Sequence, residues 1–167
     1  MRTRKSIRKK NIDYSAKGWY FVTICTKDRE CFFGNIQNDE LSPKSIGEKA
    51  IQFWMEIPEH FPMVELAEFI VMPNHIHGII GITVEISHGV ADNNNKFSKS
   101  IPGSLSVIIG QFKSSLTRWC KKNEFHKFAW QSRFHDHIIR NDESFQRISE
   151  YIINNPAKWD DDKFYIR

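Results

Sequence analysis

A histidine pair interrupts the long apolar stretch formed by residues 69–82. His75 and His77 flank Ile76, and mostly apolar residues lie on both sides of the triplet. Alternate side chains of an extended strand share a face, so both imidazoles can point to one side while Ile76 points into a core. Proline belongs at a strand edge or start, so Pro73 places the pair near the beginning of its strand. Unpartnered buried imidazoles are costly, and the spacing therefore predicts half of a metal site.

Length and composition favour one globular domain. A chain of 167 residues can bury about two thirds of its unfolded surface, and 40% hydrophobic with 13% aromatic residues excludes a mostly disordered protein. Cys25, Cys31 and Cys120 lack C-x-x-C spacing, and their odd number argues against a disulfide framework. No apolar run approaches the roughly 18 residues of a membrane span, and no signal-peptide pattern follows the basic start. We expect a soluble cytoplasmic protein without a membrane partner.

Positive charge is concentrated in the first ten residues. The formal net charge is +4, but six of the 24 basic residues lie in this segment, which has no acidic residue, and the remainder carries 18 basic against 20 acidic residues. Such arms often bind nucleic acid, although a solubilising tail has the same composition. We expect residues 1–12 to form a basic arm. Its candidate DNA contacts are Arg2, Arg4, Lys5, Arg8, Lys9 and Lys10.

Strand and helix signals alternate along the rest of the chain. Aromatic and β-branched runs predict strands over residues 18–26, 64–71, 75–84 and 128–139. Apolar residues at helical spacing predict helices over residues 45–60, from Ser104 to about 122, and after a cap at Asn141 or Asp142. A polar loop is expected over residues 85–103. The order β-α-β-β-α-β-α predicts an α+β, ferredoxin-like split β-α-β domain over residues 13–160, with a mainly antiparallel sheet and helices on one face. We expect residues 161–167 to form a C-terminal tail.

Further basic and histidine residues are candidates for nucleic-acid contact. Lys113 and Arg118 lie on the polar face of the helix after Ser104, which suits a phosphate backbone but also an ordinary solvated surface. Arg133 and Arg140 can clamp phosphates or form salt bridges. His135 and His137 form a second His-x-His pattern, for which DNA contact or structural hydrogen bonding is favoured over metal binding.

Five segments, in order, closely resemble the REP-associated tyrosine transposases, a branch of the single-tyrosine HUH transposases. They are Gly18-Trp-Tyr-Phe-Val-Thr23, Val71-Met-Pro-Asn-His-Ile-His-Gly78, Ser104-Leu-Ser-Val-Ile-Ile-Gly-Gln-Phe-Lys113, Trp130-Gln-Ser-Arg-Phe-His-Asp-His-Ile-Ile-Arg140 and Tyr151-Ile-Ile-Asn-Asn-Pro156. The resemblance covers most of the chain. It implies a ferredoxin-like nuclease and strand transferase that cleaves single-stranded DNA beside a hairpin and joins its own tyrosine to the 5′ phosphate.

The resemblance also implies roles for individual residues. Tyr151 would be the nucleophile, and His75, His77 and Asn155 would bind a divalent metal, Mg²⁺ or Mn²⁺. Asn155 precedes proline, which disfavours helical backbone at that position, so Asn154 is an alternative ligand. In HUH transposases a partner subunit can supply the tyrosine helix, which leaves both a monomer and a homodimer open. The target hairpin, and whether the protein still mobilises DNA, are left open too.

Physical chemistry supports these roles but leaves alternatives. A phenol with a pKa near 10 is a poor nucleophile at neutral pH, so the phosphate must be positioned and polarised, as a metal can do. Two imidazoles and an amide leave coordination positions open, as a catalytic site requires. The principal alternative is a noncatalytic single-stranded nucleic-acid-binding protein that stacks bases on aromatic residues. A metallohydrolase using metal-bound water would leave no protein–DNA adduct.

Deleting residues 2–10 is expected to weaken DNA binding and flatten its salt dependence without unfolding the protein. Each lost phosphate contact on single-stranded DNA should reduce the log–log salt slope by about 0.7, and at most six contacts are available. Binding titrations of the full and truncated proteins from low to moderate salt measure the difference. Identical slopes would show that the arm only solubilises the protein.

Overall fold

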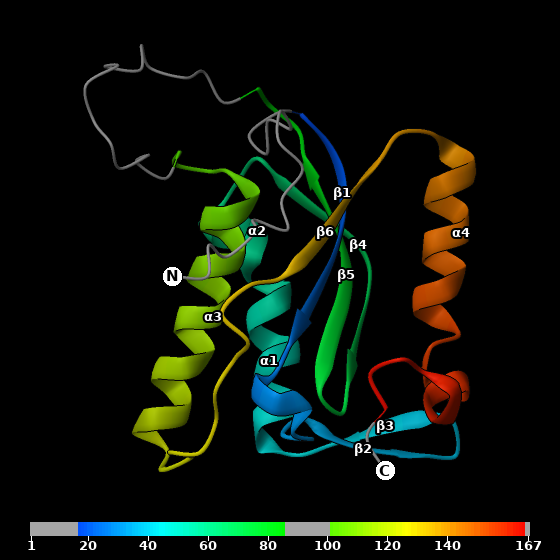
Figure 1. Ribbon diagram of the computed structural model, residues 1–167. Coiled ribbons are helices and arrows are strands. Elements are labelled where there is room, and N and C mark those ends of the chain that lie inside the picture. The colour runs from blue at the N-terminus through cyan, green and yellow to red at the C-terminus, as the bar shows by residue number, and fades with distance from the viewer. Residues whose placement is uncertain (1–16, 86–100, 166–167) are drawn as a thin grey trace, which may run out of the picture.

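A four-stranded antiparallel sheet forms the centre of the computed structural model, which describes residues 17–85 and 101–165 (Figure 1). Its strand order is β4-β5-β1-β6, and the strands are β1 (Gly18–Cys25), β4 (Val64–Met72), β5 (His75–Ile82) and β6 (His135–Ile139). The first strand lies between the third and the fourth of these in chain order, as in a split β-α-β unit. The predicted α+β fold class is confirmed.

Three helices cover one face of this sheet (Figure 1): α1 (Ser45–Met55), the short α2 (Ile57–His60) and α3 (Leu105–Lys122). Their apolar residues recur at helical spacing and face the sheet, where Trp54, Ile108 and Phe112 join Ile76 and Ile80 of β5 in the main core. The helix predicted over residues 45–60 is divided near Glu56. Ser104 occupies the N-cap of α3 as expected, although its side chain makes no capping hydrogen bond.

The last helix, α4 (Asp142–Ile153), lies against the opposite face of the sheet (Figure 1). Ile152 packs there with Ile79 and Ile139 in a second, smaller apolar cluster. The side chain of Asn141 caps the helix by accepting a hydrogen bond from the backbone N–H of Ser144 at 2.8 Å. The expectation that all helices share one face therefore holds for α1–α3 and is corrected for α4, whose apolar stripe does not itself specify which face it covers.

Several short elements depart from the sequence-based expectation. Residues 128–134 are irregular, and only 135–139 of the strand predicted over 128–139 form β6. A hairpin of β2 (Gly34–Gln37) and β3 (Glu40–Pro43), and two 3₁₀ turns, η1 (Lys27–Arg29) and η2 (Pro156–Asp161), were not expected. The hairpin strands are too short to show a clear period. Its turn residues Asn38 and Asp39 have φ of 51° and 60°, the conformation that Asn and Asp tolerate best.

The basic arm lies outside the described residues, as does most of the polar loop predicted over 85–103. In the part of the chain that is described, no helix combines the length and apolar character that crossing a membrane requires.

Gly78 is expected to be essential for packing α1 against β5. A Cβ atom at this position would lie 2.3 Å from Cζ2 of Trp54, whose side chain is fully buried. Replacement by valine should lower the free energy of unfolding by about 1–3 kcal/mol, as overpacked cores do. Urea denaturation measures the change. Gly110→Ala is the matched control, because no atom lies within 4 Å of its added Cβ and alanine is the better helix former by about 1 kcal/mol; a Gly78→Val protein as stable as the native one would contradict the packing argument.

Candidate active site

Strand β5 presents His75 and His77 to the sheet face that α4 covers. The two ring centroids lie 4.5 Å apart, and both side chains are buried. Ile76 points the opposite way, into the main core. The start of β5, the end of α4 and the C-terminal segment meet at one end of the sheet (Figure 1). The prediction that the two imidazoles share one face is therefore confirmed.

The carboxamide of Asn74 fixes the tautomer of His75. Its Nδ2 donates to the carbonyl oxygens of Arg29 and Phe164 at 3.0 and 2.8 Å. Its Oδ1 therefore faces Nδ1 of His75, 2.9 Å away. An amide oxygen only accepts hydrogen bonds, so Nδ1 of His75 must carry the hydrogen. Nε2 of His75 consequently keeps its lone pair, which is how an outer-shell partner prepares an imidazole for a metal.

His77 is held from both ends of its ring. Oγ1 of Thr23 lies 2.8 Å from Nδ1, and the hydroxyl of Tyr151 lies 3.2 Å from Nε2. If Tyr151 donates to Nε2, Nδ1 carries the hydrogen and donates to Thr23. This arrangement gives His77 the same tautomer as His75, with the lone pair of Nε2 directed toward Tyr151.

Both imidazoles are held in the neutral form. Burial lowers the pKa of His75 to about 3, and the positive charges of Lys163 and Arg29 act in the same direction. Burial also lowers the pKa of His77 well below its ordinary value, with a further contribution from His75. Neutral imidazole is the form that binds a metal ion, so no proton has to be displaced from Nε2 at neutral pH.

Tyr151 lies near the end of α4 and remains 41% exposed, in contrast to the buried histidines. Its ring packs against His77 and Phe21, with centroids 5.2 and 6.2 Å away. Burial raises the pKa of Tyr151, and the nearby Asp162 carboxylate raises it further, while a hydrogen bond with Asn155 opposes both effects. The hydroxyl is therefore accessible but protonated at neutral pH. The predicted approach of Tyr151 to the histidine pair is confirmed within a single chain.

Asn155 continues the helical backbone past the end of α4. Its φ and ψ of −62° and −40° are helical although Pro156 follows, so it stays close to Tyr151 one turn earlier. Its side chain is 2% exposed, and Nδ2 donates to Oδ2 of Asp162 at 3.2 Å. Asn154 is exposed and donates to the carbonyl oxygen of Glu150. The placement therefore favours Asn155 over Asn154 as the amide of the site.

Asp162 and Phe164 complete the site from a segment that was expected to be a tail. The two oxygens of Asp162 accept hydrogen bonds from Asn155 and from the backbone N–H of Phe164. The Phe164 ring is buried against His75, with centroids 4.6 Å apart. The assignment of residues 161–167 to a tail is corrected for this described part. The aromatic residues Phe164 and Tyr165 give the segment more apolar character than a solvated tail would need.

The donor set fits a divalent cation. Ligand atoms of His75, His77 and Asp162 lie within 4.8 Å of one another. Three buried side-chain polar atoms among the described residues lack a hydrogen-bond partner, and two of them, Nε2 of His75 and Oδ1 of Asn155, belong to this site. Such atoms are costly unless something binds them. Imidazole nitrogens with carboxylate and amide oxygens suit Mn²⁺ or Mg²⁺, with the nitrogens favouring Mn²⁺.

Other candidate residues lie away from this centre. Lys113 donates to the carbonyl oxygen of Gln131 at 2.6 Å, which occupies it within the fold. Arg118 is exposed on α3, over the other face of the sheet. Arg133 is exposed as well, and Arg140 follows β6 at the end of the sheet where Trp19 pairs with Ile139, far from the start of β5. Their contacts with DNA, like those of the arm, stay predictions.

The second histidine pair lies on β6, separated by β1 from the strand that carries the first. His135 and His137 are the register partners of Thr23 and Phe21, so they share the face of His77. Both are exposed. In the described parts of the chain, the group able to hold a metal consists of His75, His77 and Asp162, and the exposed pair does not belong to it. Their place beside the site agrees better with a surface role than with a metal centre.

Comparisons with known proteins identify two relatives of the chain. A Haemophilus influenzae protein described as "Uncharacterized protein" is 38% identical, over 98% of this chain and 93% of its own length. The chain belongs to the same family as that protein. A second Haemophilus influenzae protein, named "Putative REP-associated tyrosine transposase", is 24% identical over 87% of this chain and 74% of its length. No protein-family model matches the sequence.

A solved structure shares the fold. The structure of a REP-associated tyrosine transposase bound to a REP hairpin has a TM-score of 0.61 and 20% identity, over 93% of this chain and 74% of the other. The chain resembles the REP-associated tyrosine transposases. A crystal structure described as a "putative transposase" of Deinococcus radiodurans has a TM-score of 0.47 at 17% identity, over 88% of this chain and 97% of the other.

Mn²⁺ is expected to stabilise the folded protein through His75. A ligand that binds only the folded state adds about 2.7 kcal/mol at one hundred times its dissociation constant. Thermal unfolding with and without Mn²⁺ should show this gain for the native protein and its loss for His75→Ala. His126→Ala is the matched control, because His126 is exposed after α3. An equal Mn²⁺ effect in both variants would place the metal elsewhere.

Proposed function

We propose that the chain is a metal-dependent DNA endonuclease and strand transferase of the transposase type, with Tyr151 as the nucleophile. The observation that carries this proposal is the 3.2 Å contact between the Tyr151 hydroxyl and Nε2 of His77. It joins an accessible hydroxyl to a buried pair of neutral imidazoles. A merely structural tyrosine on α4 would not need two unpartnered buried acceptors, on His75 and Asn155, beside it.

The reaction exchanges one phosphoester for another. The phenolic oxygen of Tyr151 attacks the scissile phosphorus, the bond from phosphorus to the 3′ oxygen breaks, and the 5′ phosphate becomes attached to the tyrosine. Tyr151 gives up its proton and the leaving 3′ oxygen gains one. The covalent link keeps the energy of the phosphodiester, so a 3′ hydroxyl can reverse the step and rejoin strands without a nucleotide cofactor.

The divalent metal, held by His75, His77, Asn155 and Asp162, would supply positive charge that polarises the phosphate and stabilises the phenolate. The need for that charge follows from the pKa of Tyr151, which burial and Asp162 raise above its ordinary value. Thr23 and Asn74 act as positioning residues for the two imidazoles, and Asn74 also keeps His75 in one tautomer. Phe164 excludes water from the ring of His75.

We infer that the substrate is single-stranded DNA next to a hairpin. The similar structure of a REP-associated tyrosine transposase holds a REP hairpin, and the exposure of Tyr151 leaves an open approach for a strand. The site is assembled from one chain, so our proposal needs no partner subunit to supply the tyrosine.

Tyr151→Phe should abolish the covalent adduct and leave DNA affinity close to native, because the ring still packs against Phe21 and His77. Hairpin DNA labelled at the 3′ end of the strand that lies 3′ of the cleavage point, and so stays attached to the tyrosine, would show the adduct on a denaturing gel after incubation with Mn²⁺. Tyr165→Phe is the control, since this tyrosine packs against Trp159.

An adduct that survives Tyr151→Phe would assign the nucleophile to another residue. Binding without any adduct in the native protein would favour a noncatalytic DNA-binding protein, and cleavage with free products would favour attack by water.

A further inference from the structure

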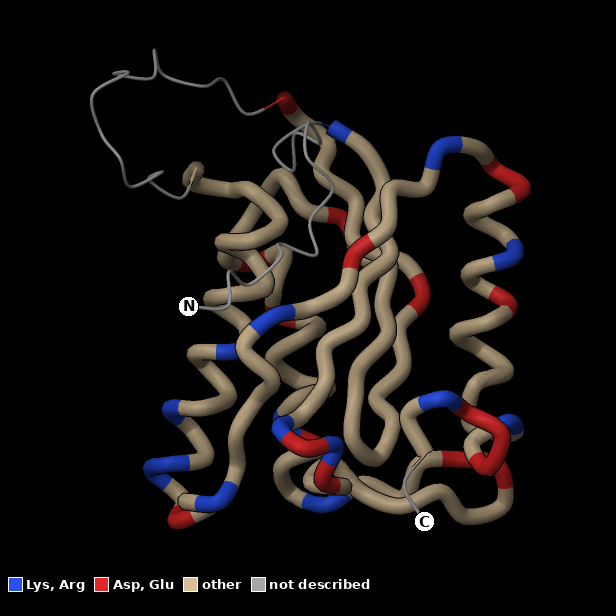
Figure 2. Tube along the Cα trace, viewed as in Figure 1, with Lys and Arg blue, Asp and Glu red and all other residues tan. Residues whose placement is uncertain are grey.

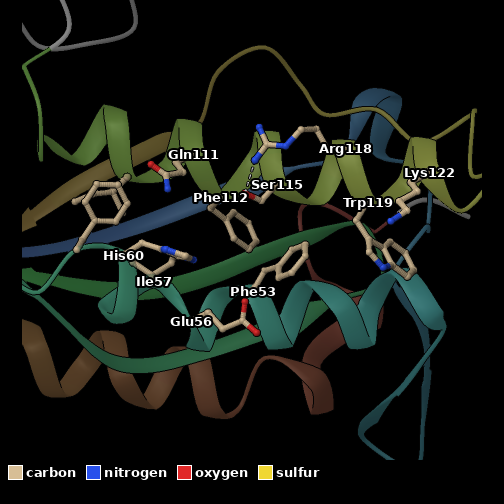
Figure 3. Close-up of a pocket in the computed structure, with 12 residues that line it drawn as sticks. Phe53, Glu56, Ile57, His60, Gln111, Phe112, Ser115, Arg118, Trp119 and Lys122 are labelled. Atoms are coloured by element: carbon tan, nitrogen blue, oxygen red, sulfur yellow. Dashed lines mark hydrogen bonds between the residues drawn. The ribbon is translucent and has the colours of Figure 1, made fainter.

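A pocket of about 290 Å³ lies between α3 and the α1–α2 pair, on the sheet face opposite the active site (Figure 3). Its apolar wall includes Phe53 of α1, and Phe112 and Trp119 of α3, whose side chains project into the space between the helices. The proposed reaction uses none of these residues. The pocket is therefore a separate feature that needs its own explanation.

The aromatic wall is held in place by the core behind it. Phe112 is buried edge-on against Trp54, with ring centroids 5.3 Å apart. Trp119 is half-buried and stacks on Phe125 at 5.6 Å. The ammonium group of Lys49 lies 5.5 Å from the ring of Phe53 and 5.6 Å from that of Trp119. Rigid, partly exposed rings next to cations are the elements with which proteins stack unpaired bases.

The charge around the pocket is positive on its α3 side. From Leu105 to Lys122 the helix contains four basic residues and no acidic one. Arg118, Lys121 and Lys122 are exposed near its end (Figure 2), and Arg118 and Lys122 line the pocket. Cations near a helix C-terminus also stabilise the helix, but that effect does not account for the aromatic hollow beside them. The combination is complementary to a base with its flanking phosphates.

Polar groups inside the pocket match the edge of a base. Glu56 lies on the α1–α2 side, and Gln111 and Ser115 lie on α3 (Figure 3). A carboxylate accepts from an exocyclic amine, and a carboxamide both donates and accepts, which are the contacts that distinguish bases. Ser115 accepts a hydrogen bond from Arg118 at 3.1 Å, which holds the guanidinium over the rim.

We propose that this pocket binds one unpaired nucleobase of the DNA substrate, with Arg118 and Lys122 contacting the flanking phosphates. The proposal rests on the proposed function in taking single-stranded DNA as the ligand. The base stacks on Trp119 and Phe53 while Glu56 and Gln111 face its edge. Because the pocket and Tyr151 lie on opposite faces of the sheet, the base held here is not at the cleavage point, and it anchors a part of the strand that passes around the sheet.

The test combines the variant Trp119→Leu with DNA that lacks a single base. Fluorescence anisotropy measures the affinity of a labelled hairpin with a single-stranded flank, and of a series in which one unpaired nucleotide at a time is abasic. In the native protein one position should cost about five- to 150-fold in affinity, the range for a stacked base. Trp119→Leu should lose a similar factor with intact DNA and then be insensitive to the abasic position.

Two surface variants keep the result interpretable if Trp119→Leu folds poorly. Ser115→Leu fills the pocket, and Arg118→Gln removes a rim charge. Ser115→Leu should repeat the loss of sensitivity to the abasic position, whereas Arg118→Gln should weaken binding and lower the salt slope by about 0.7. Arg147→Gln, which neutralises an exposed arginine of α4, is the matched control and should leave that sensitivity as in the native protein.

The outcomes separate this proposal from the proposed function. If Trp119→Leu and Ser115→Leu bind every DNA of the series with the affinity of the native protein, the pocket assignment is overturned, even if Tyr151 still forms the adduct. An equal loss for every abasic position would also overturn it, since that result describes a general basic surface. If Trp119→Leu or Ser115→Leu changes the oligomeric state measured by sedimentation but not the affinity for DNA, the pocket binds a protein partner instead. If the native protein forms no adduct but its affinity still depends on one unpaired base in the predicted way, only the nuclease proposal is overturned.

Discussion

The site depends on the hydrogen bonds that the carboxamide of Asn74 makes. This fully buried side chain lies in the turn between β4 and β5 and hydrogen-bonds Arg29, Phe164 and His75 at once. Arg29 has a φ of 58°, a conformation that costs free energy for a residue with a Cβ. The hydrogen bond to its carbonyl oxygen helps to hold that strained turn. A single amide thus joins the turn η1, the C-terminal segment and a candidate metal ligand, and its loss would leave several buried polar groups unpaired.

Strand β5 connects this site to the main core. Every residue of β5 is buried, so the strand has two internal faces, with Ile76 and Gly78 against α1 and His75 and His77 against α4. A slip of one residue in register would exchange these faces and put imidazoles into the aliphatic core. The core therefore fixes the position of the histidines. The close approach of Trp54 at Gly78 is part of the same constraint, because it sets how near α1 lies to the strand that carries the site.

Local periodicity made part of this site predictable from the sequence. The shared face of His75 and His77 follows from a period of two, and the proximity of Asn155 to Tyr151 follows from helical spacing, which survives here because Asn155 keeps helical angles before proline. The face covered by α4 was not predictable, since an apolar stripe specifies that a helix packs but not where. Asp162 and Phe164 were missed for a related reason. Their roles depend on the chain turning back after η2, and no period or turn signal encodes that return.

Under the proposed function, the charges of the site relate its nucleophile to its candidate metal ligands. Two neutral imidazoles and an amide contribute no charge, while Asp162 contributes a negative one that raises the pKa of Tyr151. The same carboxylate repels an approaching DNA phosphate. Without a cation, Asp162 therefore disfavours the phenolate form of Tyr151. Arg29 and Lys163 bring positive charge close to His75, and this charge offsets part of the repulsion of the phosphate. Under the proposed function, a divalent ion held by these ligands would offset the charge of Asp162 and stabilise the phenolate of Tyr151, so cleavage is expected to depend on the metal.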